Sequence, residues 1–317
     1  MSGAASLVSI PEAPVPDHGK AEWFSGADGA TLRAAFFSPD GKARGSVVVS
    51  PGRSEPIEKY FEVVQDLLDR GFVVLVHDWR GQGLSHRALP DRLKGHAAGF
   101  KPFLSDYQAL LAAFETRLPK PWIALGHSMG GCLTALVLAH GETRFDAAVL
   151  SAPMLGLNTG GKPARAARAL AWIMARCGLA GDYVLGDKGD PFSQTFATDA
   201  LTHDATRYAR YQAQVHANRD IALGGITWGW TDFAFSACAW LRRDKGVEAI
   251  AIPVTIVAAG DDSRVLVADE RSIAERIPKG RYVEIAGAFH EILIETDDVR
   301  AQFWAVFDET ADGVAPR

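Results

Sequence analysis

The sequence predicts an α/β fold in which a mostly parallel central sheet is flanked by helices. Short, continuous apolar runs rich in β-branched residues alternate with segments whose apolar residues recur every three or four positions. Continuous apolar runs are typical of parallel strands buried on both faces, and the intervening segments have the periodicity of amphipathic helices. The alternation therefore predicts right-handed crossovers within one sheet.

The first half of the chain is expected to begin with an extended arm and a hairpin. Residues 1–20 form the arm, because they contain the proline-rich stretch PEAPVP. Residues 22–37 form two strands around Asp28-Gly29, since Asp-Gly is a typical hairpin turn. Buried strands are then expected at 45–50, 72–77, 122–126 and 146–151, with helices at 57–68, 102–117 and 132–140 between them.

The alternation stops after the fourth buried strand. Residues 154–232 contain no strand-like run, and a segment of about 80 residues is too long for a simple loop, so a helical cap is expected there. The alternation resumes with strands at 254–260 and 281–287 and helices at 265–277 and 298–307. The expected organisation is an arm at 1–20, a core formed by 21–153 and 233–310, and a cap at 154–232.

Composition and charge exclude several classes of protein. The 317 residues are 48% hydrophobic and 22% charged, which is typical of a globular chain. The chain has 33 basic and 38 acidic residues, so it has no surplus of positive charge that would indicate a nucleic-acid partner. No obligate protein partner is evident. The three cysteines are widely separated and lack a C-x-x-C pair, which gives no support for a disulfide framework or a zinc site. No metal or other cofactor is expected.

The sequence shows neither a secretory signal nor an apolar run near the roughly 18 to 20 residues of a membrane span. We therefore expect a cytoplasmic protein that meets a membrane, if at all, peripherally at its inner face.

The segment WIALGHSMGGCLTALVLAH contains the pattern G-x-S-x-G, centred on Ser128. A predicted strand runs directly into the pattern and a predicted helix follows it, which is the strand-turn-helix setting of a nucleophile elbow. The glycines allow a sharp turn that would project the Ser128 hydroxyl at the carboxyl edge of the sheet. A surface serine without a chemical role would not need this setting, so Ser128 is the candidate nucleophile.

A serine nucleophile needs a base and an orienting acid, which in this geometry follow in the chain order Ser, Asp or Glu, His. Of the nine histidines, His290 is the one that follows the last predicted strand. The residue four positions further on is an isoleucine, which excludes a zinc-binding helix of the H-E-x-x-H type. The acid is expected after the strand at 254–260, where Asp261 and Asp262 both stand.

The negative charge that develops on the attacked carbonyl oxygen requires two backbone N–H donors. One is expected from the residue after the nucleophile, Met129, and the other from the loop SPGRSEP, at Arg53.

The stretch PGRSEPIEKYFEVVQDLLDRGFVVLVHDWRGQGLS, together with GHSMGG and GAFHEIL, resembles the bacterial lysophospholipase and monoacylglycerol lipase family of α/β-hydrolases, also described as serine-aminopeptidase-like. The resemblance covers about residues 20 to 310. It implies an α/β-hydrolase fold and a catalytic triad of Ser128, Asp262 and His290. One departure, Ser263 placed directly after the acid, keeps Asp261 as an alternative.

The resemblance implies a serine hydrolase that cleaves a carboxylic ester of a monoacyl lipid, a lysophospholipid or a monoacylglycerol, through an acyl-enzyme. A general carboxylesterase or thioesterase for small acyl substrates is the nearest alternative. A non-catalytic ligand-binding relative is the alternative of another class, but such relatives usually lack a triad member. An aminopeptidase is less favoured, because the sequence identifies no acidic pocket for an amine.

The cap is expected to cover the site and to supply an acyl pocket. Trp228, Trp230 and Phe233 are the candidate lining residues, although packing in the core is an equally good interpretation for each. On a helix across KPARAARALAWIMARCG, the four basic residues share an arc of about 120° away from Leu170, Met174 and Cys177. Such a helix can lie on an anionic bilayer, but a solvated cap helix packed on the core is the more common interpretation.

Overall fold

A central sheet runs through the computed structural model, which describes residues 3–186, 189–198 and 200–316. Residues 1–2 of the expected arm and 187–188 and 199 of the expected cap lie outside the described residues. In the described part of the chain, nine strands pair in the order β1-β2-β3-β5-β4-β6-β7-β8-β9. Their bounds are β1 Gly3–Ala5, β2 Lys20–Ser25, β3 Thr31–Phe37, β4 Gly45–Ser50, β5 Phe72–His77, β6 Trp122–His127, β7 Ala147–Ser151, β8 Val254–Ala259 and β9 Gly280–Ile285.

The sheet is antiparallel at its amino-terminal edge, from β1 to β5, and parallel from β5 through β9. The six strands β4 to β9 lie at the positions where strands were predicted, and the hairpin of β2 and β3 turns at the expected Asp28-Gly29. The expected extended arm contributes an edge strand, because Gly3 to Ala5 pair with β2.

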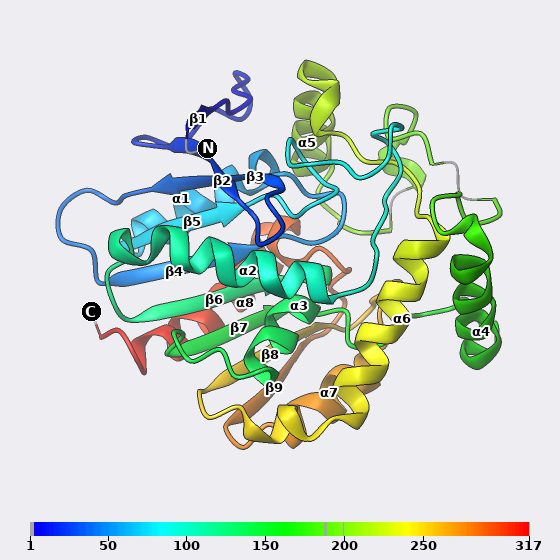
Figure 1. The fold of residues 1–317 in the computed structure, drawn as a ribbon. Coiled ribbons are helices and arrows are strands. Elements are labelled where there is room, and N and C mark those ends of the chain that lie inside the picture. Colours follow the sequence, from blue (N-terminus) through cyan, green and yellow to red (C-terminus); the bar gives the residue numbers. More distant parts are fainter. Residues whose placement is uncertain (1–2, 187–188, 199, 317) are drawn as a thin grey trace.

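Helices cover both faces of the sheet, as Figure 1 shows. Apolar side chains of α2, α3, α6 and α7 form one core with the sheet, and those of α1 and α8 form a second core on the opposite face. The helix bounds are α1 Phe61–Asp69, α2 Lys101–Phe114, α3 Met129–Ala139, α4 Ala164–Met174, α5 Ala205–Ala217, α6 Trp228–Arg243, α7 Val267–Arg276 and α8 Asp297–Asp312. This arrangement confirms the predicted α/β-hydrolase fold.

Two helices extend three or more residues beyond a predicted end. Helix α3 begins at Met129 and not at residue 132, because the turn at Ser128 sets its start although two glycines in its first turn have low helix propensity. Helix α8 continues to Asp312, five residues beyond the prediction. Its last turns are mostly polar and so fall outside the apolar periodicity, yet Ala311 packs in the core.

The segment between β7 and β8 leaves and re-enters the sheet at neighbouring parallel strands, with Ala148 in register with Val254. It contains α4, α5 and α6, and α6 spans the expected boundary between cap and core at residues 232 and 233. In the described ranges no helix is long and apolar enough to cross a membrane.

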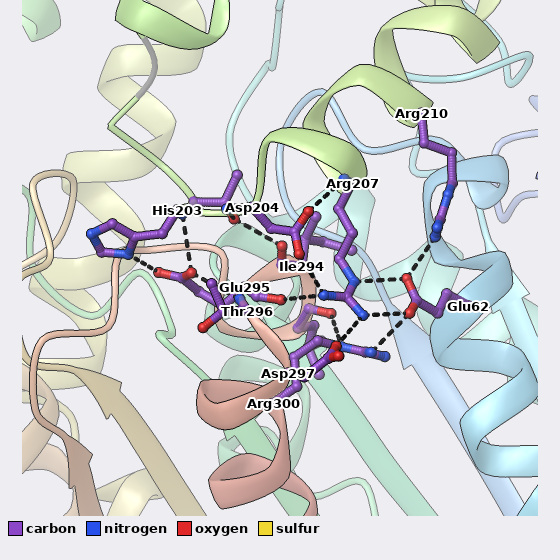
Figure 2. Close-up of polar contacts among 12 residues, drawn as sticks. Glu62, His203, Asp204, Arg207, Arg210, Ile294, Glu295, Thr296, Asp297 and Arg300 are labelled. Atoms are coloured by element: carbon purple, nitrogen blue, oxygen red, sulfur yellow. Dashed lines mark hydrogen bonds and ion pairs between the residues drawn. The ribbon is translucent and has the colours of Figure 1, made fainter. Parts of the chain in front are cut away.

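A polar cluster anchors α5 to the core (Figure 2). Glu62 on α1 accepts hydrogen bonds from Arg207 and Arg210 of α5 and from Arg300 of α8. At the adjoining chain segment, the buried carboxylate of Glu295 accepts from both the backbone and the ring of His203. Because one carboxylate accepts hydrogen bonds from three guanidinium groups, α5 is connected to both α1 and α8 at a single point.

Candidate active site

Ser128 occupies a sharp turn between β6 and α3. Its backbone has φ 49° and ψ −116°, a strained region for a residue with a side chain. The glycines of the motif are required by close approach: a Cβ atom on Gly130 would lie 2.0 Å from the carbonyl oxygen of Ser50, and one on Gly126 would lie 2.8 Å from Gly131 Cα. The sequence pattern therefore produces the elbow geometry, with Ser128 held at the carboxyl edge of the sheet.

His290 lies between Ser128 and an acidic residue. Its Nε2 is 2.9 Å from Ser128 Oγ, and its Nδ1 is 2.6 Å from Asp262 Oδ2. In the tautomer that general-base chemistry requires, Nδ1–H donates to the carboxylate and Nε2 accepts the serine proton. The three side chains thus have the relative positions that activate a serine hydroxyl.

The carboxylate that meets His290 is that of Asp262. Its other oxygen accepts the backbone N–H groups of Arg264 and Val265 at 2.7 and 3.0 Å. Burial disfavours ionisation, but the hydrogen bond and charge of His290 and these two backbone donors outweigh it and lower the pKa of Asp262. Asp262 is therefore the ionised partner that an imidazolium needs.

Asp261, the alternative acid, lies on the outside of the same turn. Its backbone N–H donates to the carbonyl oxygen of Ala288, while that of Asp262 donates to Ala259. Asp261 is exposed, whereas the side chain of Asp262 is fully buried. Neighbouring residues of one turn point in different directions, so only one of the two reaches His290.

The expected oxyanion donors come from two different segments of the chain. Met129 is the first residue of α3, and Arg53 is in the loop after β4; both line the same cavity as Ser128. Side chains fix the Arg53 loop, because the N–H of Gly52 donates to Glu55 at 2.5 Å and that of Ser54 donates to Gln82 at 2.6 Å. The Arg53 guanidinium donates to the carbonyl oxygen of Gly224 and lies over the ring of Trp230, so it contacts the cap region.

A cavity of about 560 Å³ lies at Ser128 and His290 and is lined in part by the segment between β7 and β8. Both apolar and polar side chains line it. The apolar ones include Met154, Leu157, Leu223, Ile226, Trp230 and Val265, and the polar ones include Gln194, Thr195, Thr198, Tyr208, Tyr211 and Gln212. A second hollow of about 580 Å³ lies beside the amino-terminal arm, remote from the candidate triad.

Of the three aromatic residues predicted to line the acyl pocket, Trp230 alone is among the residues that line this cavity. Phe233 is buried in the core, with its ring centroid 5.1 Å from that of Phe103. Trp228 packs with Ala171 and Phe235 under α4. The prediction is corrected for Trp228 and Phe233. Trp228 lies about 160° around the helix from Trp230, whereas Phe233, about 60° away, packs against Phe103 in the core.

Several lining residues have no motif in the sequence. Tyr208, Tyr211 and Gln212 belong to α5, whose position above the site is fixed by long-range contacts. Lys59 and Glu291 also line the cavity. For these residues, the sequence indicates closeness to the site only through the position of Glu291 directly after His290. In the part of the chain that the structure describes, no group of three or more His, Cys, Asp or Glu side chains is arranged to hold a metal ion.

The site has a serine at an elbow after a parallel strand, and a histidine between that serine and a buried carboxylate. This arrangement defines a serine hydrolase of the α/β-hydrolase fold. Comparison with known proteins places the chain within this class. It belongs to the serine aminopeptidase S33 family, which it matches over residues 41–297.

Among curated relatives, lysophospholipase L2 of Escherichia coli K12 is 33% identical over 293 residues, covering 88% of this chain and 83% of the relative. A monoacylglycerol lipase of Mycolicibacterium smegmatis is 25% identical over 277 residues, covering 86% and 91% of the two chains. In fold, a soluble variant of monoglyceride lipase from Saccharomyces cerevisiae superposes with a TM-score of 0.73 at 19% identity, covering 98% of each chain. The chain is a serine ester hydrolase of this family.

Proposed function

We propose that this chain hydrolyses the single carboxylic ester of a monoacyl lipid, either a lysophospholipid or a monoacylglycerol, through an acyl-enzyme on Ser128. The observation that carries the proposal is the continuous hydrogen-bonded series from Ser128 Oγ through His290 to Asp262. The names of the relatives support the substrate class, since they include lysophospholipases and monoacylglycerol lipases.

In the first step, Ser128 Oγ attacks the ester carbonyl carbon while His290 Nε2 takes the serine proton. Asp262 stabilises the resulting imidazolium, and the N–H groups of Arg53 and Met129 stabilise the oxyanion. The glycerol oxygen leaves with the proton from His290. Water, activated by the same histidine, then attacks the acyl-serine and releases the fatty acid.

The cavity supports a substrate with one chain and one polar head. Apolar side chains from the β7 end and the cap can accommodate an acyl chain, and the polar residues of the 190s segment and α5 can face a head group. About 560 Å³ lies within the ordinary range of sites for lipid-sized and drug-sized molecules. A small acetate ester would leave most of this volume unfilled.

We also propose that the cap contacts a lipid surface through α4. The structure changes the sequence interpretation of this helix: its packed side is formed by Ala167, Ala171 and Met174. Its outward side carries Leu170, Trp172 and Ile173, each 47–50% exposed. Within the described ranges, five of the six large exposed apolar side chains fall between residues 170 and 185. Concentrated exposed apolar surface with arginines beside it is typical of interfacial helices.

Hydrolysis of a substrate panel tests the ester chemistry. The panel contains lysophospholipids, monoacylglycerols, short p-nitrophenyl esters and acyl-thioesters, with Ser128→Ala as the control. We expect the highest kcat/KM on a long-chain monoacyl ester and no hydrolysis by the Ser128→Ala variant. Preference for short esters or thioesters would favour the alternative acyl hydrolases, and binding of monoacyl lipid without turnover would favour a non-catalytic relative.

Sedimentation with vesicles tests the surface contact separately. Wild type is expected to bind vesicles that contain an anionic lipid at low salt, and Trp172→Glu to bind less without losing activity on a soluble ester. Equal sedimentation of the two proteins, or none of either, would contradict a role of α4.

A further inference from the structure

Beside the candidate triad, Lys59 joins two carboxylates that come from distant parts of the chain. Its Nζ is 3.2 Å from Glu55 Oε1 and 2.5 Å from Glu291 Oε1. All three side chains are at most 10% exposed. Lys59 belongs to the 3-10 turn at Ile57–Tyr60 that precedes α1, whereas Glu291 is 232 residues further along the chain.

Lys59, Glu55 and Glu291 are called the trio below. Each of its two carboxylates is attached to a segment that carries an active-site group. Glu55 accepts the N–H of Gly52 at 2.5 Å, and Gly52 directly precedes the expected oxyanion donor Arg53. Glu291 directly follows His290. The ammonium group of Lys59 therefore joins the oxyanion loop to the histidine loop.

A third active-site segment touches the trio. His127, the residue before Ser128, has its Nε2 3.6 Å from Glu55 Oε1, and burial lowers the pKa of His127 despite the attraction of Glu55. The neighbours of the nucleophile, the base and the oxyanion donor thus meet around one lysine.

Electrostatic attraction between the ammonium group of Lys59 and the two carboxylates stabilises the trio. Burial alone would favour the neutral forms, but the charges of His127 and Lys59 and hydrogen bonds from Tyr60 and Gly52 lower the pKa of Glu55 to about 2. Glu291 and Glu55 raise the pKa of Lys59 above its usual range against the opposing effect of burial. The lysine remains an ammonium group, and its Nζ lies 4.7 Å from the ring centroid of the cap residue Tyr211.

We propose that Lys59 is a positioning residue for the hydrolytic reaction: by bridging Glu55 and Glu291, it sets the separation between the oxyanion loop and His290 around Ser128. The inference rests on the proposed function, because it assigns Lys59 to that same site. Displacements of an ångström among reacting groups can lower rates by about a hundredfold, so a bridge of this kind acts on kcat more than on substrate binding.

The chain offers a matched control for the loss of a buried cation. Arg33 is also fully buried and also joins two carboxylates, Glu58 and Asp78, but it is not among the residues that line the cavity. Both bridges contact the same 3-10 turn, because Glu58 directly precedes Lys59. Lys59→Met removes the cation that joins the segments of Arg53 and His290, whereas Arg33→Met removes one that joins neither. Lys59→Arg keeps the positive charge and tests whether a different cation at this position restores the activity that Lys59→Met loses.

The experiment measures kcat and KM on p-nitrophenyl butyrate per folded molecule, with folding followed by circular dichroism, and the rate of inactivation by a fluorophosphonate. We expect Lys59→Met to lower kcat and the inactivation rate about tenfold to a hundredfold at a KM within about twofold, and Lys59→Arg to recover most of both. Arg33→Met is expected to be less stable but to keep its kcat.

Wild-type kcat in folded Lys59→Met would overturn the proposal, as would equal losses of kcat in Lys59→Met and Arg33→Met. If Lys59→Met does not fold, Glu291→Gln replaces it with the same expected loss of kcat and the same contrary result. Wild type that cleaves p-nitrophenyl butyrate but no monoacyl lipid would refute the substrate assignment alone. Wild type inert toward both the ester and the fluorophosphonate would overturn both proposals.

Discussion

Replacing Asp262 by asparagine should abolish most turnover, and the geometry shows why. Asp262 Oδ1 is held by two backbone N–H groups, at 2.7 and 3.0 Å, and Oδ2 faces His290 Nδ1 at 2.6 Å. In Asp262→Asn the backbone donors retain the amide oxygen, so the NH₂ group occupies the Oδ2 position. It can only donate to Nδ1, which places the imidazole proton on Nε2, where it cannot accept the proton of Ser128.

The wrong tautomer and the lost charge together should lower kcat by about 10⁴-fold, equivalent to about 5.4 kcal/mol of transition-state stabilisation. The assay is steady-state hydrolysis of p-nitrophenyl butyrate. Asp261→Asn is the matched control: its carboxylate is exposed on the same turn, and kcat should stay within about twofold of wild type. A large loss of kcat in Asp261→Asn combined with an active Asp262→Asn would refute the assignment of the acid.

Three further predictions concern stability. Gly130→Ala should lower the free energy of unfolding by about 1–3 kcal/mol or more, seen as a lower Tm, because its methyl group would meet the Ser50 carbonyl oxygen at 2.0 Å; an unchanged Tm would contradict the close packing of the elbow. Arg33→Met should cost about 3–5 kcal/mol in urea unfolding, since it leaves Glu58 and Asp78 buried without their cation, and a loss below about 1 kcal/mol would argue against that bridge. Glu62 is desolvated but is paired with three arginines, which lower its pKa from 4.5 to about 2. Its stabilising effect is therefore complete above about pH 4.5 and lost as the pH falls toward 2, and Glu62→Gln should flatten the pH dependence of stability in that range.

The sequence alone was sufficient to predict those parts of the fold that depend on the local pattern of apolar residues. Continuous apolar runs located β4 to β8, and the order of Ser128 and His290 along the strands was enough to place both at one sheet edge. The choice between Asp261 and Asp262 could not be made from residue types, because it depends on the direction of each side chain in one turn. The structure brings Asp262 to His290.

The cap was harder to predict, because its side chains are oriented by contacts across the molecule. Trp230 lines the cavity, whereas Trp228 and Phe233, two and three residues away on the same helix, pack elsewhere. The same applies to the bridge between Lys59 and Glu291, where nothing local signals a partner 232 residues away. The outward apolar side of α4 likewise depends on which face meets α6.

The central claim is that Ser128, activated by His290, forms the acyl-enzyme. Its most direct test is mass spectrometry of the protein after reaction with a fluorophosphonate, with peptide mapping and residual ester hydrolysis measured on the same sample. The account predicts one adduct per chain on the peptide that contains Ser128, loss of activity in proportion to labelling, and no adduct in Ser128→Ala. Full activity in fully labelled protein, or an adduct on another serine that accompanies the loss, would contradict it.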